Sequence, residues 1–206
     1  ENISSIYCLG DLVGYYCYFN EVVELFERNR IPCILGNHDY ALVYNEGIIS
    51  TSKTCTNILK WQLENVSNSC LSFLKSLKPS ISVSFEGKDI LLVHGGLEDF
   101  TNEYLFNVNE TYLENFNFEK DILVSGHTHL SSYLSFFNGK KWINPGSVGQ
   151  PRDGNYKASY AIIDNDFSVR FKRVNYDFNK VITSMANNGF DEYISRGLAT
   201  GTKIGN

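Results

Sequence analysis

Residues 122–129 have the sequence ILVSGHTH, in which a short apolar run ends in a glycine and two histidines. Four other apolar runs also end in glycine or another small residue followed by polar groups. The segments after those runs are Gly10-Asp11, Gly36-Asn37-His38-Asp39, His94-Gly95-Gly96 and Asn144-Pro145-Gly146-Ser147. In layered α/β domains, ligands bind outside the carboxyl ends of the strands. We therefore predict that these five segments converge on one site.

The apolar runs alternate with amphipathic segments, which indicates an α/β layered domain with a mixed sheet system. Strand-like runs occupy residues 3–9, 31–35, 81–85, 90–93, 122–124, 132–137, 141–143, 159–163 and 168–174. Helical patterns occupy residues 20–30, 56–63, 69–77, 112–118, 178–186 and 191–198. The dipeptide Asn138-Gly139 predicts a hairpin turn, and Glu86-Gly87-Lys88 predicts another. We expect a single domain over residues 1–206, with residues 176–206 as helices packed on it.

The composition excludes several classes of protein. The chain has 206 residues, 43% of them hydrophobic, and a formal net charge of -5. Its lysines and arginines form no cluster, which disfavours general nucleic-acid binding through phosphate neutralisation. No apolar run approaches the roughly 18 residues of a transmembrane helix, so we expect no membrane partner. The five cysteines contain no Cys-x-x-Cys pair, which favours buried thiols in a reducing compartment and predicts a cytoplasmic protein.

The histidines point to chemistry at the predicted site. All four histidines of the chain, His38, His94, His127 and His129, lie in the segments that follow the apolar runs. Neutral imidazole is a common ligand of transition metals, and a carboxylate such as that of Asp11 can bridge two cations. Imidazole and oxygen donors without thiolate suit Mn, Fe, Co or Zn.

Single residues of this set also fit structural roles. Asp11 fits a turn or a helix cap, and Asn37 or Asp39 fits the cap of a following helix. His94 fits a hydrogen-bonded histidine at a sheet edge, and Gly146 fits an ordinary turn. Together these interpretations would require five coincidences, so a functional site is the better hypothesis.

In chain order, the motifs resemble those of the calcineurin-like metallophosphoesterase superfamily. The matching motifs are Gly10-Asp11, Gly36-Asn37-His38-Asp39, His94-Gly95 and Gly126-His127-Thr128-His129. Residues 144–154, NPGSVGQPRDG, are similar to the small bacterial and archaeal phosphodiesterase branch. The resemblance implies a four-layer fold, a two-sheet β-sandwich flanked by helices, with a binuclear metal site at the strand ends.

The resemblance also implies the metal ligands. Asp11 would bridge two metals, Asn37, His94 and His127 would complete one of them, and His129 would bind the other. The cofactors implied are two divalent transition metals per intact site, Mn foremost, with Fe, Zn, Co or Ni as alternatives.

The catalytic residue implied by the resemblance is His38, which would lie over the substrate phosphate. It would stabilise the transition state or protonate the leaving oxygen. Further candidates for contacts with the substrate or with the metal ligands are Asp39, Asn144, Ser147 and Arg152. Arg152 fits a substrate contact and a subunit contact equally well.

One motif of the family is absent from the chain. Family members begin with a strand ending in Asp-x-His and a helix, and these two residues supply the rest of the metal shell. We expect truncation by about thirty residues, rather than a degenerate member, because the other motifs are intact. The four donors Asp11, Asn37, His94 and His127 would then hold one metal, while Asp11 and His129 would bind a second weakly.

These features predict a metal-dependent phosphoesterase that hydrolyses a phosphodiester or a dinucleoside polyphosphate by attack of metal-activated hydroxide. Its partner would be a small phosphate ester, and a homo-oligomer is compatible with the sequence. Leu12-Val13-Gly14-Tyr15 stands where protein phosphatases carry an arginine-containing signature, which favours diesters. The alternatives are a phosphomonoesterase or protein phosphatase, and a non-catalytic interaction module like the retromer subunit of this fold.

Overall fold

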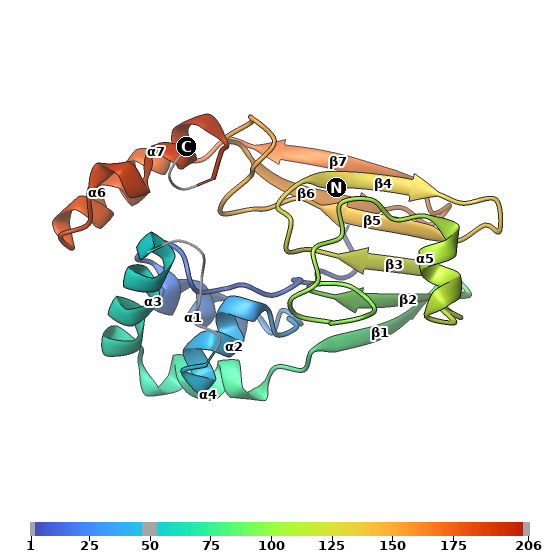
Figure 1. The fold of residues 1–206 in the computed structure, drawn as a ribbon, viewed down its shortest axis with the longest axis horizontal. Coiled ribbons are helices and arrows are strands. Elements are labelled where there is room, and N and C mark those ends of the chain that lie inside the picture. The colour runs from blue at the N-terminus through green and yellow to red at the C-terminus, as the bar shows by residue number, and fades with distance from the viewer. Residues whose placement is uncertain (1–2, 47–52, 204–206) are drawn as a thin grey trace.

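A five-stranded sheet forms the centre of the molecule, with the strand order β1-β2-β3-β5-β4 (Figure 1). The computed structural model describes residues 3–46 and 53–203. The strands of this sheet are β1 (Ser80–Phe85), β2 (Lys88–Val93), β3 (Ile122–Ser125), β4 (Ser131–Ser135) and β5 (Lys141–Pro145). A second sheet pairs β6 (Ala158–Ile163) with β7 (Val169–Val174). The predicted mixed α/β architecture with two sheets is confirmed.

The three central strands β2, β3 and β5 run parallel, and the edge strands β1 and β4 pair with them antiparallel. All four residues of β3 are buried, as expected for a strand covered on both faces. Because parallel strands end at the same edge of a sheet, the segments after β2, β3 and β5 emerge side by side. His94 and His127 follow β2 and β3, and Asn144 lies near the end of β5, so these three strand ends converge as predicted.

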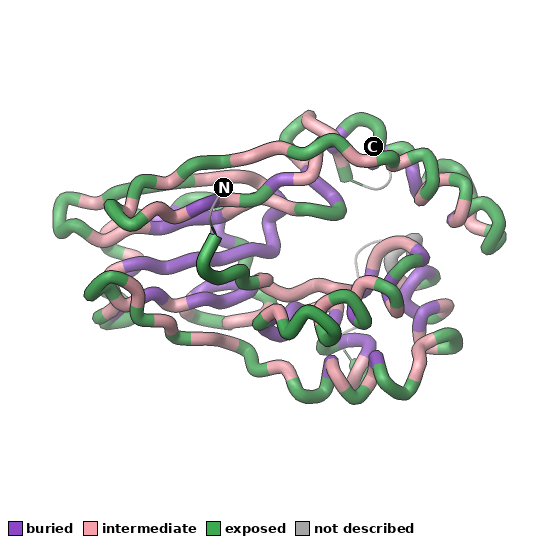
Figure 2. The backbone as a smooth tube through the Cα atoms, turned by 180° about the vertical axis from the view of Figure 1, so that it is seen from behind, coloured by how far each residue is buried: buried purple, intermediate pink, exposed green. Residues whose placement is uncertain are grey.

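Two apolar layers cover the faces of the five-stranded sheet. On one face, Leu123 and Trp142 pack with Leu113 of helix α5 (Glu110–Asn115). On the other face, Val124 and Ile143 pack against side chains of β6 and β7. Burial of each such side chain contributes about 1.5–3 kcal/mol. Figure 2 shows the buried residues concentrated along these strands. The two sheets therefore face each other, and helix α5 covers the outside.

Four helices form a separate apolar cluster beside the sheets. They are α1 (Phe19–Asn29), α2 (Asn37–Tyr44), α3 (Lys53–Asn65) and α4 (Asn68–Ser76). Their buried side chains include Val23, Leu42, Leu59 and Leu74. The chain continues after β7 with α6 (Phe178–Asn187), a 3-10 turn (Glu192–Ile194) and α7 (Arg196–Thr200). Met185 of α6 is fully buried against Cys17 and Ile58.

The predicted strands at residues 3–9 and 31–35 are wrong as continuous strands. They meet only in the isolated parallel bridge between Cys8 and Cys33, and Ile34 forms another bridge with Lys78. The backbone N–H of Ile31 donates to Phe26 at the end of α1, and Pro32 has no N–H to donate. The second segment is therefore short of donors for a ladder.

Helix α2 was not predicted, because residues 36–39 were expected to form a loop and the segment shows little segregation of apolar residues to one face. The helix is stabilised at its first turn instead. Gly36 is its N-cap, and the Asp39 side chain accepts a hydrogen bond from the Gly36 N–H at 2.9 Å. This is the helix-capping role considered above for Asp39.

In residues 3–46 and 53–203, no helix combines the length and the apolar character that crossing a membrane requires.

Candidate metal centre

Asp11 is held in a turn where two segments of backbone touch. Gly10 has a φ of 85° and Asp11 a φ of 58°. A Cβ at Gly10 would lie 2.5 Å from the Gly36 nitrogen, and a Cβ at Gly36 would lie 2.1 Å from Asp11 Oδ1. Only glycines allow this approach. The His38 N–H donates to Asp11 Oδ1 at 2.9 Å, which fixes the carboxylate against the start of α2.

Asp39 links the same two segments through hydrogen bonds to their backbone. Its buried carboxylate accepts hydrogen bonds from the backbone N–H groups of Asp11 (2.7 Å), Gly36 (2.9 Å) and Val13 (3.3 Å). Burial and the nearby charge of Asp11 raise the pKa of Asp39 to about 7. Its partners are backbone groups of the two loops, so its place in the structure is to position Asp11.

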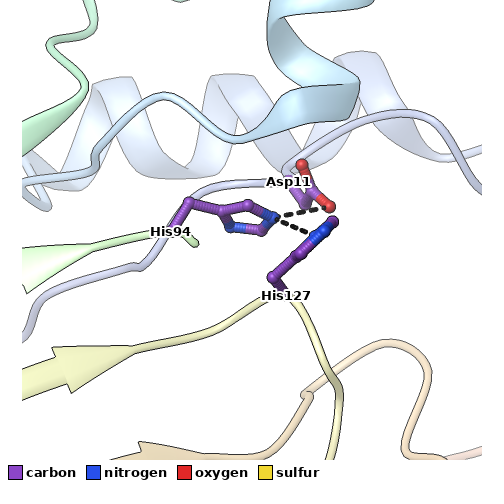
Figure 3. A group of neighbouring side chains, drawn as sticks. All are labelled: Asp11, His94 and His127. Atoms are coloured by element: carbon purple, nitrogen blue, oxygen red, sulfur yellow. Dashed lines mark hydrogen bonds and ion pairs between the residues drawn. The ribbon is translucent and has the colours of Figure 1, made fainter. Parts of the chain in front are cut away.

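His94 lies at the end of β2 with its ring orientation fixed by the backbone. Its Nδ1–H donates to the Leu9 carbonyl oxygen at 2.5 Å, so Nε2 is the nitrogen that could bind a metal in place of its proton. Nε2 lies 3.1 Å from Asn37 Oδ1, 3.1 Å from His127 Nδ1 and 3.2 Å from Asp11 Oδ2. Figure 3 shows Asp11, His94 and His127 pointing toward one another.

Nitrogen and oxygen atoms with lone pairs lie close together in this cluster. Their mutual repulsion is relieved only if a positive charge lies among them. Burial alone would lower the pKa of His94, but Asp11 and the Leu9 carbonyl raise it to about 9. Burial likewise opposes ionisation of Asp11, whereas His94 and His38 hold its pKa well below the usual range. Either a proton or a metal cation can therefore supply the charge that the cluster needs.

The geometry fits a metal ion. Ligands at 2.0–2.1 Å in a tetrahedral site lie about 3.4 Å apart, close to the 3.1–3.2 Å separations around His94 Nε2. Asp11 Oδ2, one of the atoms facing His94 Nε2, is buried without a hydrogen-bond partner. Asp11, His94 and His127 also form a group whose ligand atoms all lie within 4.8 Å of one another. With Asn37, these residues could hold one divalent cation.

The loop after β3 presents His127 and His129 from left-handed backbone, each with a φ of 62°. Asn144 at the end of β5 braces this loop, because its Nδ2 donates to the Gly126 carbonyl at 2.6 Å and to Thr128 Oγ1 at 3.0 Å. Burial and His94 lower the pKa of His127 to about 4. The ring is therefore neutral at pH 7, as a metal ligand must be.

His129 is buried next to this cluster but is not one of the three residues grouped around His94. Its Nδ1–H donates to the Gln150 carbonyl oxygen at 2.7 Å, which leaves Nε2 as the lone-pair donor. Burial and the charge of Arg152 lower the pKa of His129 to about 3. The structure therefore keeps His129 neutral and orients it, consistent with the predicted ligand of a second metal.

His38 lies beside Tyr15, with ring centroids 4.4 Å apart. Burial lowers the pKa of His38. Arg152 Nη2 donates to the Tyr15 hydroxyl at 2.9 Å and to Gln150 Oε1 at 2.9 Å. Ser147 lies outside this group, where its hydroxyl accepts from the Gln150 N–H at 3.0 Å and shapes the turn before Arg152.

Residues 1–167 match the calcineurin-like phosphoesterase superfamily domain. The chain belongs to this superfamily. An uncharacterized protein of Methanocaldococcus jannaschii is 35% identical over 218 residues, covering 98% of this chain and 88% of that protein. Phosphoesterases of this superfamily depend on metal ions, and the Asp11, His94 and His127 cluster is the corresponding candidate centre.

Two solved structures share the fold. A metallophosphoesterase from Sphaerobacter thermophilus has a TM-score of 0.79 and 28% identity, covering 97% of this chain and 89% of that chain. A hypothetical protein from Pyrococcus horikoshii has a TM-score of 0.86 and 19% identity, with coverages of 98% and 87%. The predicted fold of this superfamily is confirmed by both.

Two side chains that support the site lie outside the superfamily motifs and were not predicted from the sequence. Gln62 of α3 is fully buried; its Oε1 accepts from the Gly14 N–H at 2.8 Å, and its Nε2 donates to the Tyr16 carbonyl at 2.8 Å. Tyr104 packs on the His127 ring with centroids 3.8 Å apart. No local pattern marks either residue, because their partners lie 23 to 48 positions away in the chain.

Proposed function

We propose that this phosphoesterase uses divalent metal ions to hydrolyse a small phosphodiester or a dinucleoside polyphosphate. The observation that carries the proposal is the set of three contacts at 3.1–3.2 Å around His94 Nε2. Divalent cations held there would polarise a phosphate and supply a hydroxide nucleophile near neutral pH. The acidic chain is compatible with such a substrate, because the cations would neutralise the phosphate.

The residues of the site take separate roles in this proposal. Asp11, Asn37, His94 and His127 hold one cation, and Asp11 and His129 offer ligands to a second. Hydrogen bonds fix the orientation of two of these imidazoles before a cation binds. The Leu9 carbonyl accepts the Nδ1–H of His94, and the Gln150 carbonyl accepts that of His129. When a cation binds, His94 gives up only its Nε2 proton, while its Nδ1–H stays on the Leu9 carbonyl.

His38 and Arg152 act on the phosphate itself. His38 is supported by Tyr15 and deals with charge on the leaving oxygen, while Arg152 orients the ester. The hydrogen bonds from Arg152 to Tyr15 and Gln150 hold its guanidinium next to the ring that packs on His38, which supports a substrate contact.

Turnover of two chromogenic esters tests the diester preference. The 206-residue chain and a version extended upstream by an Asp-x-His strand and helix are loaded with Mn²⁺. Both are assayed with bis(p-nitrophenyl) phosphate and with p-nitrophenyl phosphate. We expect faster turnover of the diester, and equal or faster turnover of the monoester would overturn that choice.

His38→Asn separates an enzyme from an interaction module of the same fold. We expect turnover to fall by about 100-fold or more, the usual effect of removing a placed acid–base group. Metal content should remain unchanged, because His38 is not among the proposed ligands. A chain that keeps its turnover with His38→Asn would contradict the assigned role of this residue.

A further inference from the structure

Two exposed aromatic rings lie beside the candidate metal centre. Tyr104 packs on His127, with centroids 3.8 Å apart and planes inclined by 35°. Phe106 lies parallel to Tyr104, at a centroid distance of 5.7 Å and an angle of 6°. The two residues are nevertheless 52% and 55% exposed. The aromatic surface thus continues from a proposed metal ligand out to solvent.

The loop that carries these rings is fixed by buried contacts. Leu105, between the two aromatic residues, is only 5% exposed and belongs to the core on the outer face of the sheet. Glu103 Oε2 accepts hydrogen bonds from the Glu98 N–H and from the Tyr112 hydroxyl, both at 2.9 Å. The Tyr112 hydroxyl in turn accepts from the Leu97 N–H at 2.7 Å. Tyr104 and Phe106 are therefore held in place before any ligand binds.

Exposed apolar side chains are common on proteins, but here two of them lie parallel, on an anchored loop and against a proposed metal ligand. Burial of Leu105 anchors the loop, and polar residues at positions 104 and 106 would satisfy the same backbone. Parallel exposed rings are suited to stacking against a flat heteroaromatic group. Proteins that bind single-stranded nucleic acids stack bases on aromatic side chains in this way.

We propose that Tyr104 and Phe106 form an aromatic subsite that stacks on the nucleobase of a nucleoside phosphate ester. The inference rests on the proposed function and specifies its substrate class. Arg152, Tyr15 and His38 surround the centre together with His129, whereas Tyr104 contacts His127. A phosphate at the metal ligands would thus have charged and hydrogen-bonding groups near His38 and His129, and the aromatic subsite next to His127.

Equilibrium binding of two phosphates tests the subsite without any turnover. Adenosine 5′-monophosphate and ribose 5-phosphate share the phosphate and sugar and differ in the base. Isothermal titration of the 206-residue chain in saturating Mn²⁺ should show adenosine 5′-monophosphate binding at least about fivefold more tightly, the lower end of the effect of one stacked base. Equal affinities would overturn the subsite while leaving the phosphoesterase proposal standing.

Leucine variants show whether Tyr104 and Phe106 cause the preference for adenosine 5′-monophosphate over ribose 5-phosphate. Tyr104→Leu and Phe106→Leu keep apolar bulk without a ring, and each should lower the affinity for adenosine 5′-monophosphate about fivefold or more while leaving ribose 5-phosphate within about twofold. Phe106→Leu is the cleaner variant, because it spares the residue that packs on His127. Tyr104→Phe should retain the preference, since it preserves the ring.

Phe137→Leu is the matched control, because Phe137 is a fully exposed ring in the turn between β4 and β5, and it should change neither affinity. Retention of the full preference in both leucine variants at positions 104 and 106 would overturn the proposal. If neither phosphate binds at all, the subsite and the proposed function both fail, which separates that outcome from equal binding.

Discussion

At the scale of single residues, one buried carboxylate controls the position of another. Asp39 has no exposed surface, and it accepts three backbone N–H bonds from the two loops that meet at Asp11. A side-chain amide in this position would keep only one oxygen acceptor, so its NH₂ would face at least one of the three N–H groups. The placement of Asp11 therefore depends on a residue that need not touch a metal.

Asp39→Asn tests this dependence. The amide NH₂ would face backbone N–H groups, so we expect the free energy of unfolding to fall by about 1–3 kcal/mol, and Mn²⁺ affinity to fall with it. Urea unfolding and metal titration measure the two effects. Asp166→Asn is the control, because the exposed Asp166 accepts through Oδ1 from Ser168 and asparagine keeps that acceptor. Equal stability of the two variants would contradict the role of Asp39.

The neutral, buried His129 makes the metal-free protein sensitive to acid. Its pKa is lowered from 6.5 to about 3, so the unfolded chain binds a proton there that the folded chain does not. Stability from this group is therefore present above about pH 6.5 and is lost as the pH falls toward 3.

His129→Asn removes the titration and keeps an N–H donor for the Gln150 carbonyl. In EDTA, between pH 6 and pH 5, wild type should lose about 1 kcal/mol more unfolding free energy than the variant. Urea unfolding at the two pH values measures the difference. Parallel losses in the two proteins would show that His129 is protonated in the folded state.

At the scale of elements, the ends of neighbouring strands support each other. β3 carries the loop with His127 and His129, and β5 supplies Asn144, whose side chain donates twice into that loop. Gln62 of α3 likewise holds the Gly14–Tyr16 backbone, since it accepts from the Gly14 N–H and donates to the Tyr16 carbonyl. The ligands thus lie on loops whose shape is determined by side chains of adjacent elements.

Asn144→Asp removes the two donated hydrogen bonds without changing the size of the side chain. We expect metal affinity to fall about 10- to 100-fold, as for other groups that orient metal ligands. Unfolding free energy should also fall, by about 1–3 kcal/mol, because a carboxylate would face the Gly126 carbonyl.

Asn138→Asp provides the control for this change. The exposed Asn138 accepts from the Lys140 N–H through Oδ1, and an aspartate preserves that bond. Its metal affinity and stability should match wild type, and a similar loss in both variants would point to a general effect of added charge.

At the scale of the whole molecule, the candidate centre joins two differently built parts. Asn37 opens helix α2 and Asp11 belongs to the turn packed against it, whereas His94 and His127 follow strands of the five-stranded sheet. Their cores are separate clusters, one among the four helices and the others on the faces of the sheet. A cation at the centre would therefore bind the folded arrangement of both parts and stabilise it.

Metal addition should raise the melting temperature. At Mn²⁺ one hundred times above its dissociation constant, about 2.7 kcal/mol of stabilisation corresponds to an increase of about 5–10 °C over the EDTA-treated chain. Elemental analysis of the 206-residue chain should find one tightly held metal. Asp11→Asn should abolish both results, while two tightly held metals in wild type would contradict the expected asymmetry.

The family, the mixed two-sheet architecture and the polar segments with the candidate ligands were predictable from the sequence alone. These are local properties: a buried apolar run followed by Gly-His or Gly-Asp predicts a strand and a functional loop wherever its neighbours lie. The same local reasoning failed at residues 3–9 and 31–35, which meet only in an isolated bridge. In the second segment, Ile31 donates to Phe26 and Pro32 has no N–H. It also missed α2, which depends on the capping contact between Gly36 and Asp39.

Which of these groups meet, and at what distance, depends on how the separate elements pack. Contacts of His94 with Asn37, of Gln62 with Gly14 and of Tyr104 with His127 join residues far apart in the chain. No periodicity encodes such pairs, because they arise where separate elements pack and bury polar groups that must then find partners. The charge balance of the centre and the aromatic surface beside it are consequences of that packing.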